Sequence, residues 1–171
     1  MIAYQNGDEL ALKRIFERYR DSLYRFLYRY SRDEQLSIDI VQGTFVTLQT
    51  KKRQFDQSKG QLKAYLFQIA YRVMITKVNR RKKWRNILPF LIPLDKQEVS
   101  IADRLTIQAA IDSLPELQRA VILLVYYHVL KQDEVANVLK IPVGTVKSRL
   151  HTAIKGLKER LEVDYDGAGP F

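Results

Sequence analysis

Polar and basic side chains follow Pro142 at a spacing that suits contacts with DNA. Proline interrupts a helix because its ring is fixed and it lacks an N–H donor, so residues 133–140 and 143–161 are predicted to form two helices joined by a tight turn. In the second helix, apolar residues recur every three or four positions and predict one buried stripe, with Thr145 as a candidate cap. The other faces carry side chains that can reach base edges or phosphates, namely Lys147, Ser148, His151, Thr152 and Lys155. The pattern therefore predicts a helix-turn-helix that reads duplex DNA.

Positive charge is concentrated in the middle of the chain. The 171 residues carry a net charge of +10, and residues 57–94 alone hold nine Lys or Arg and no acid. Such a block favours a polyanionic partner, usually nucleic acid, although a solvated basic face is the alternative. Aromatic residues lie within or beside this block, at Tyr65, Phe67, Tyr71 and Trp84. Rings among basic groups suit melted DNA, where unstacked bases can rest on them, but they could equally belong to the core.

Several functional classes are excluded by composition. The chain has no Cys and two His, so thiol catalysis, disulfides and a cysteine zinc site are ruled out and a metal site is not expected. Gly-rich phosphate loops, nucleophile elbows and paired catalytic carboxylates are absent from the sequence, so we expect neither an enzyme nor a cofactor. The apolar run at residues 121–125 is too short for a membrane span, and the start lacks a signal-peptide core. We therefore expect a soluble cytoplasmic protein, with His128 as a core or boundary residue.

The periodicity predicts an all-α fold of two small helical domains joined by a flexible linker. In the first domain, residues 1–83, helices are predicted through residues 12–30, capped by Asn6 or Asp8, and over residues 34–50 and 61–83. Residues 84–103 contain two prolines without a sustained period and are predicted to be the linker. The second domain, residues 104–163, is helical and includes the helix-turn-helix. The tail, residues 164–171, is expected to be disordered.

Four segments resemble the extracytoplasmic-function (ECF) sigma factors of the sigma-70 family. The most specific are residues 112–119, Asp-Ser-Leu-Pro-Glu-Leu-Gln-Arg, and residues 143–150, Val-Gly-Thr-Val-Lys-Ser-Arg-Leu. Asp-Ile-Val-Gln at 39–42 with Thr-Phe at 44–45, and Tyr-Leu-Phe-Gln-Ile-Ala at 65–70, support the resemblance in the first domain. The similarity covers residues 16–161, and the four segments occur in the family's order and spacing.

The resemblance implies a division of labour between the domains. The first domain would bind the clamp of core RNA polymerase and capture the melted minus-ten element, while the second would bind the flap and read the minus-35 element as duplex. The clamp contacts would be Asp39 and Gln42. The minus-ten contacts would be Lys63, Tyr65, Arg72, Lys77, Arg80 and Arg81. The minus-35 contacts would be Thr145, Lys147, Ser148, His151 and Thr152, with Arg149 and Lys155 on phosphate. An anti-sigma factor is a further partner that the family implies.

The clamp-binding helix departs from the family pattern. Family members usually have an acid cluster at its start and a Glu after the Gln, whereas residues 36–38 here are Leu-Ser-Ile and position 43 is Gly. One hypothesis is sequence drift, in which the acids were lost and the protein binds polymerase weakly or through compensating apolar contacts at Leu36 and Ile38. Another is regulation by a Ser/Thr kinase, because a phosphate on Ser37 or Thr44 would restore a charge of about −1.5 to −2.

The turn of the helix-turn-helix also departs from the family pattern. The turn of the family's reader usually has Gly where this chain has Lys140, which costs free energy if the backbone is left-handed there. An alternative function also stays open, a stand-alone helix-turn-helix regulator without productive polymerase binding.

Overall fold

The computed structural model describes residues 1–87 and 107–166, with side chains placed for residues 1–81 and 107–161. All regular structure within these ranges is helical, and no strand occurs among the described residues. The predicted all-α class is confirmed.

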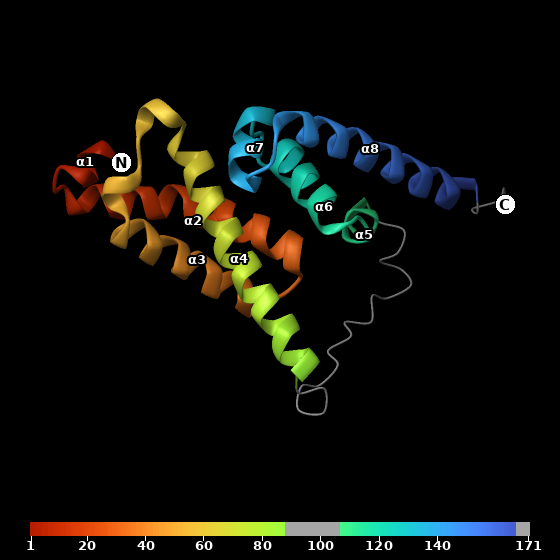
Figure 1. Cartoon of the computed structure of the whole chain (residues 1–171), viewed down its shortest axis with the longest axis horizontal. Helices are drawn as coiled ribbons and strands as arrows, with labels where there is room; N and C mark the ends of the chain where they lie inside the picture. The colour runs from red at the N-terminus through yellow and green to blue at the C-terminus, as the bar shows by residue number, and fades with distance from the viewer. Residues whose placement is uncertain (88–106, 167–171) are drawn as a thin grey trace.

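The first domain consists of three long helices and short connecting turns (Figure 1). They are α1 (Ile2–Gln5), α2 (Glu9–Ser31), α3 (Glu34–Thr50), the 3-10 turns η1 (Lys52–Gln54) and η2 (Gln57–Lys59), and α4 (Leu62–Ile87). Asp8 caps α2 by accepting a hydrogen bond from the Ala11 N–H at 3.2 Å, and Asp33 caps α3 by accepting one from the Leu36 N–H at 2.7 Å. These caps fix where each helix begins, so the predicted start of α3 is confirmed and Asp8 is the cap of α2.

The fourth helix is longer than its periodicity predicts. It ends at Ile87 rather than residue 83, because nothing between Arg80 and Pro89 breaks a helix. Residues 84–87 of the predicted linker are therefore helical, and the rest of that linker lies outside the described residues. At the other end of the chain, residues 164–166 of the predicted tail continue the last helix, and residues 167–171 lie outside the described residues.

The second domain contains the predicted helix-turn-helix. Its elements are α5 (Ile107–Asp112), α6 (Glu116–Ile122), the π-helical turn η4 (Leu123–Tyr127), α7 (Gln132–Leu139) and α8 (Val143–Asp166). Lys140 ends α7 with φ 57° and ψ 44°, so a non-glycine residue does adopt the left-handed conformation at this turn. Because α8 begins at Val143, Thr145 lies inside its first turn and is not the cap that the sequence suggested.

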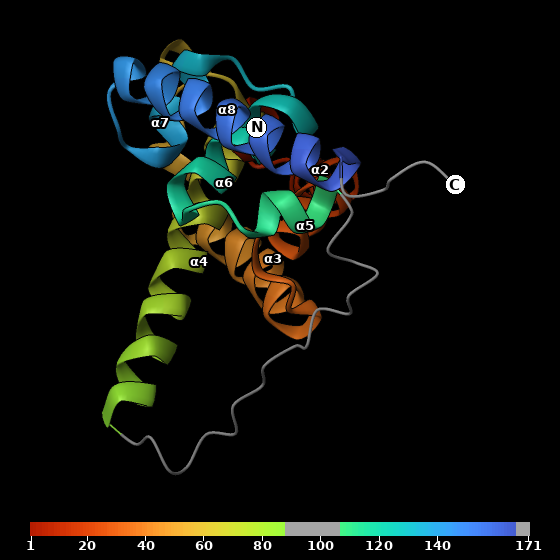
Figure 2. The same ribbon diagram turned by 90° about the vertical axis from the view of Figure 1, so that its right-hand side faces the viewer.

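The two domains pack against each other instead of standing apart. Helix α7 lies beside the N-terminal half of α4, and η4 contacts α2 (Figures 1 and 2). One continuous cluster of buried residues runs through both domains and includes Phe26 and Phe67 from the first and Leu124 and Val135 from the second. The C-terminal half of α4 extends away from the second domain (Figure 2). Which parts of α4 are covered therefore depends on how the domains are docked.

Candidate nucleic-acid and polymerase interfaces

The outer face of α8 is exposed as the sequence predicts. Val146, Leu150 and Ala153 are buried against the rest of the second domain. The exposed side chains on the other side are Lys147, Ser148, His151, Thr152 and Lys155. Two of the hydroxyls bond to the helix itself, Ser148 Oγ to the Thr145 carbonyl at 3.1 Å and Thr152 Oγ1 to the Ser148 carbonyl at 2.9 Å. The face therefore presents basic donors beside hydroxyl oxygens that can accept, a mixed set that could enter a major groove.

Arg149 lies apart from this exposed set. Its side chain is half-buried, and its Nε atom is buried without a hydrogen-bond partner. Burial raises the pKa of Tyr71 on α4, Glu116 adds to the rise, and the positive charge of Arg149 opposes both. The guanidinium is thus close enough to the first domain to affect Tyr71. The phosphate contact that the family resemblance implies for Arg149 stays a prediction.

The predicted minus-ten side chains are spread along α4. Lys63 and Arg81 are separated by about 27 Å along the axis, given about 1.5 Å per residue. Further along the helix, Arg72 and Arg80 are exposed, whereas Lys77 pairs with Asp39 at 3.6 Å and Arg81 pairs with Asp33 at 2.6 Å. Although burial opposes it, the Leu36 N–H and Arg81 hold the pKa of Asp33 below its ordinary value. The basic surface between Arg72 and Arg81 is therefore partly neutralised.

The inner half of α4 meets the second domain. Lys63 Nζ donates a hydrogen bond to the carbonyl oxygen of His128, and Gln68 Nε2 donates one to the carbonyl oxygen of Asn137 at 2.6 Å. The Tyr65 ring packs against Phe55 with their centroids 5.4 Å apart. Lys63 and Tyr65 thus contact other parts of the protein, whereas Arg72 and Arg80 are exposed to solvent.

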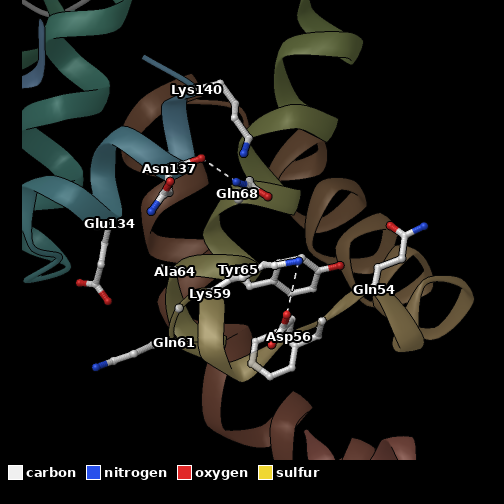
Figure 3. Close-up of a pocket in the computed structure, with 12 residues that line it drawn as sticks. Gln54, Asp56, Lys59, Gln61, Ala64, Tyr65, Gln68, Glu134, Asn137 and Lys140 are labelled. Carbon is white, nitrogen blue, oxygen red and sulfur yellow. Dashed lines mark hydrogen bonds and ion pairs between the residues drawn. The ribbon is translucent and has the colours of Figure 1, made fainter. Parts of the chain in front are cut away.

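A pocket of about 330 Å³ lies where these elements converge (Figure 3). The first domain contributes residues from the turn before α4 and from its first turns, including Lys59, which pairs with Asp56 at 3.3 Å. The second domain contributes Glu134, Asn137 and Lys140. Sequence reasoning missed this junction, because no local pattern indicates that α7 will lie on α4.

The exposed face of α3 carries one exposed acid, Glu34, at the start of the helix. Gln42 is exposed, and so are Ile38 and Val46, to 36% and 57%. Asp39 is half-buried and accepts a hydrogen bond from Gln35 at 3.2 Å in addition to its pair with Lys77. Of the two suggested apolar contacts, Ile38 faces outward, but Leu36 is buried and cannot meet a partner.

The proposed modification sites lie in the core. The side chains of Ser37 and Thr44 are both 0% exposed. Ser37 Oγ donates to the Asp33 carbonyl at 2.6 Å and Thr44 Oγ1 to the Ile40 carbonyl at 2.7 Å. Ser37 and Thr44 lie next to the positions where family members have acids, and for that reason the sequence suggests that they are exposed. The rotation of α3 about its axis instead turns both hydroxyls inward. A kinase cannot reach either hydroxyl in this conformation, so the burial of both side chains argues against the phosphorylation hypothesis.

Among the described residues, the structure shows neither a candidate metal site nor a helix that could span a membrane. No group of three or more His, Cys, Asp or Glu side chains in this part of the chain could hold a metal ion. None of the described helices is long and apolar enough to cross a bilayer.

The chain matches two family models in order. Residues 15–85 match sigma-70 region 2 and residues 104–157 match sigma-70 region 4. Together these cover more than half of the sequence, so the chain belongs to the sigma-70 family. The first domain is accordingly a region 2 domain and the second a region 4 domain.

Similar proteins point to one branch of this family. The chain is 28% identical over 173 residues to the ECF RNA polymerase sigma factor SigW of Bacillus subtilis, covering 92% of each chain. It is 31% identical over 162 residues to the ECF RNA polymerase sigma factor SigL of Mycobacterium tuberculosis, covering 90% of this chain and 91% of the relative. The chain is therefore an alternative sigma factor for RNA polymerase, of the ECF type.

Solved structures share its fold. The sigma factor RpoE of Bartonella quintana, crystallised with the anti-sigma factor NepR, aligns with a TM-score of 0.74 at 23% identity, over 89% of this chain and 97% of its own. CnrH in complex with the cytosolic domain of CnrY aligns with a TM-score of 0.70 at 24% identity, over 93% and 92%. The fold of both domains is thus common to these proteins.

Proposed function

We propose that this sigma factor directs core RNA polymerase to promoters by gripping DNA at two points and assisting its melting. The observation that carries the proposal is the exposed polar face of α8, which belongs to a region 4 domain joined to a basic region 2 domain. Lys147, Ser148, His151 and Thr152 would read the minus-35 element, with Lys155 on phosphate. Thr145 is half-buried in the first turn of α8 and would contribute at the edge of this face.

The minus-ten element would be held by α4. Arg72 and Arg80 are exposed and available for the DNA backbone. Lys77 and Arg81 would exchange their acidic partners for phosphate, while Lys63 and Tyr65 at the start of the helix would meet melted bases. The exposed α3 face with Ile38, Gln42 and Val46 would dock on the polymerase clamp, with Asp39 at its edge.

An anti-sigma factor is proposed as a further partner. The support is that RpoE and CnrH, which share the fold, were solved in complex with an anti-sigma factor and with the cytosolic domain of CnrY, respectively. A Ser/Thr kinase is not part of the proposed function, because Ser37 and Thr44 are buried.

Run-off transcription on fragmented genomic DNA tests the proposal without knowledge of the promoter. Core polymerase with this chain is expected to produce transcripts whose start sites share two spaced sequence blocks, and core polymerase alone is not. The chain carrying both Lys147→Ala and His151→Ala serves as a control that should lose those starts. Absence of any specific start, together with a footprint on duplex DNA by the chain alone, would favour the stand-alone regulator instead.

A further inference from the structure

We propose that this chain closes on itself, with the second domain acting as an internal lock on the N-terminal half of α4. The lock consists of His128 together with the polar contacts that α7 and α5 make to the first domain. This inference rests on the proposed function, because it concerns the surface that would hold melted DNA.

His128 is the centre of the lock. It follows η4 in the second domain, yet its imidazole is only 6% exposed and lies in a slot of the first domain. The ring centroid is 5.6 Å from that of Phe26 on α2 and 4.8 Å from that of Phe67 on α4. The Nδ1 atom is 3.2 Å from Ser22 Oγ, a hydrogen bond across 106 positions of sequence. One side chain therefore joins α2 and α4 of region 2 to region 4.

Polar contacts surround this centre on the α4 side. Lys63 donates to the His128 carbonyl, and Gln68 donates to the Asn137 carbonyl one and a half turns further along. Figure 3 shows the Gln68 side chain reaching α7 across the edge of the pocket. While the Lys63 amino group donates to this carbonyl, it points at protein and not at DNA. In the docked form, Lys63 is therefore unavailable as one of the proposed minus-ten contacts.

A second set of contacts closes the opposite edge, at the C-terminal end of α2. Arg32 Nε pairs with Asp112 Oδ2 at 2.8 Å, and Arg29 donates to Gln108 Oε1 at 3.1 Å. Arg119 of α6 also donates to the Tyr30 carbonyl at 3.1 Å. The interface thus combines an apolar centre with hydrogen-bonded edges, the arrangement found in specific protein–protein interfaces.

Closure affects the two proposed DNA sites unequally. The polar face of α8 and the side chains of Arg72, Arg80 and Arg81 on α4 remain exposed, but the pocket beside the start of α4 is lined by both domains. The closed chain could therefore meet duplex DNA while one part of its proposed minus-ten surface, at Lys63 and Tyr65, stays half-buried. Productive promoter opening would require the domains to separate.

A cross-link that holds the domains together tests the lock, and the lack of native Cys makes it site-specific. The full chain carrying Gln68→Cys and Asn137→Cys is joined by a short bis-methanethiosulfonate reagent, which dithiothreitol then cleaves. We expect cross-linking to reduce transcription at least tenfold and cleavage to restore it. A Lys13→Cys and Glu17→Cys pair, two exposed residues on α2, is the matched control and should transcribe equally in both states.

A second measurement reports closure without transcription. In the wild type, Lys63 should react with acetic anhydride several-fold more slowly than exposed Lys13, as read by mass spectrometry. Arg32→Asp should raise the Lys63 rate, and Arg32→Asp combined with Asp112→Arg should lower it again by restoring the pair.

The outcomes separate the two proposals. Equal reactivity of Lys63 and Lys13 in the wild type, or full transcription by the cross-linked chain, would overturn the lock alone. Absence of specific transcription by the wild type and by the cleaved chain would overturn the proposed function, while Lys63 reactivity would still show whether the domains close.

Discussion

Asp39 of α3 and Lys77 of α4 form an ion pair with 3.6 Å between Oδ2 and Nζ. The charge of Asp39, proposed to contact polymerase, is thus neutralised by Lys77, proposed to contact DNA. The neighbouring exposed positions on this face of α3 are Glu34, Ile38, Gln42 and Val46, so Glu34 is the one acid beside Asp39 that could steer a basic partner. Polymerase binding by this chain should accordingly depend more on shape and apolar contact than on charge.

Replacing Asp39 should have a small effect on binding to core polymerase. Because an exposed ion pair contributes about 0.2–1 kcal/mol, Asp39→Asn should weaken binding by less than about fivefold. The dissociation constant should be measured at low and high salt, with Glu17→Gln on α2 as the control. A loss of a hundredfold that disappears in high salt would show that the carboxylate steers binding after all.

Replacing either of two lysines on α8 should impair promoter binding, each in a different way. Lys147→Ala should relax discrimination at one minus-35 position by about 1–3 kcal/mol, because a base contact is lost. Lys155→Ala should weaken all sequences alike and reduce the slope of log affinity against log salt by about 0.9. Holoenzyme binding to promoters with each minus-35 base permuted measures both effects. If Lys147→Ala acted uniformly across sequences, its proposed base contact would be wrong.

A charge at position 44 should destabilise the chain rather than activate it. Thr44 is fully buried, so Thr44→Glu would place an unpaired carboxylate in the core at a cost of about 3–5 kcal/mol. For a chain of this size the melting temperature should fall by roughly 6–20 °C. Calorimetry should show little change for Gln42→Glu, on the exposed face of the same helix. A stable Thr44→Glu variant with raised polymerase affinity would revive the phosphorylation hypothesis.

Gly43→Ala should stabilise the region 2 domain. A Cβ atom there would lie 3.5 Å from Val73 Cγ1, an ordinary contact, and Ala favours the helix by about 1 kcal/mol over Gly. The melting temperature should rise by roughly 2–4 °C. Gly60→Ala is the contrasting variant and should lower it, because φ is 151° at Gly60. A lower melting temperature for Gly43→Ala would mean that α3 and α4 pack more closely than the structure shows.

Docking of the domains should weaken as the pH falls. Burial, reinforced by the charges of Lys63, Arg25 and Arg29, lowers the pKa of His128 to about 4, against an ordinary value of about 6.5. The separated form binds a proton more readily, so the docked form is at full stability above about pH 6.5 and loses about 3 kcal/mol as the pH falls towards 4. Energy transfer between dyes on the two domains measures the separation from pH 8 to 4. His128→Gln should remove this dependence, and an unchanged profile would assign it to other groups.

The helices and the reader face were determined by the sequence alone. The cap at Asp8, the break at Pro142 and the periodic apolar stripes act within one or two turns, so they can be recognised without knowing the rest of the fold. The same local logic placed Lys147 and His151 on the exposed face of α8. It could not set the rotation of α3 about its axis, because that depends on which helices cover it, and Thr44 is buried for this reason.

Only the tertiary structure decided which side chains meet. Lys77 faces Asp39, Arg149 turns towards α4, and His128 enters a slot between Phe26 and Phe67. These contacts join residues far apart in the chain, and their geometry follows from how whole helices pack rather than from any local spacing. The sequence therefore determined the exposed polar face of α8 that is proposed to read DNA, whereas the packing of α7 on α4 determined how much of the proposed minus-ten surface is open.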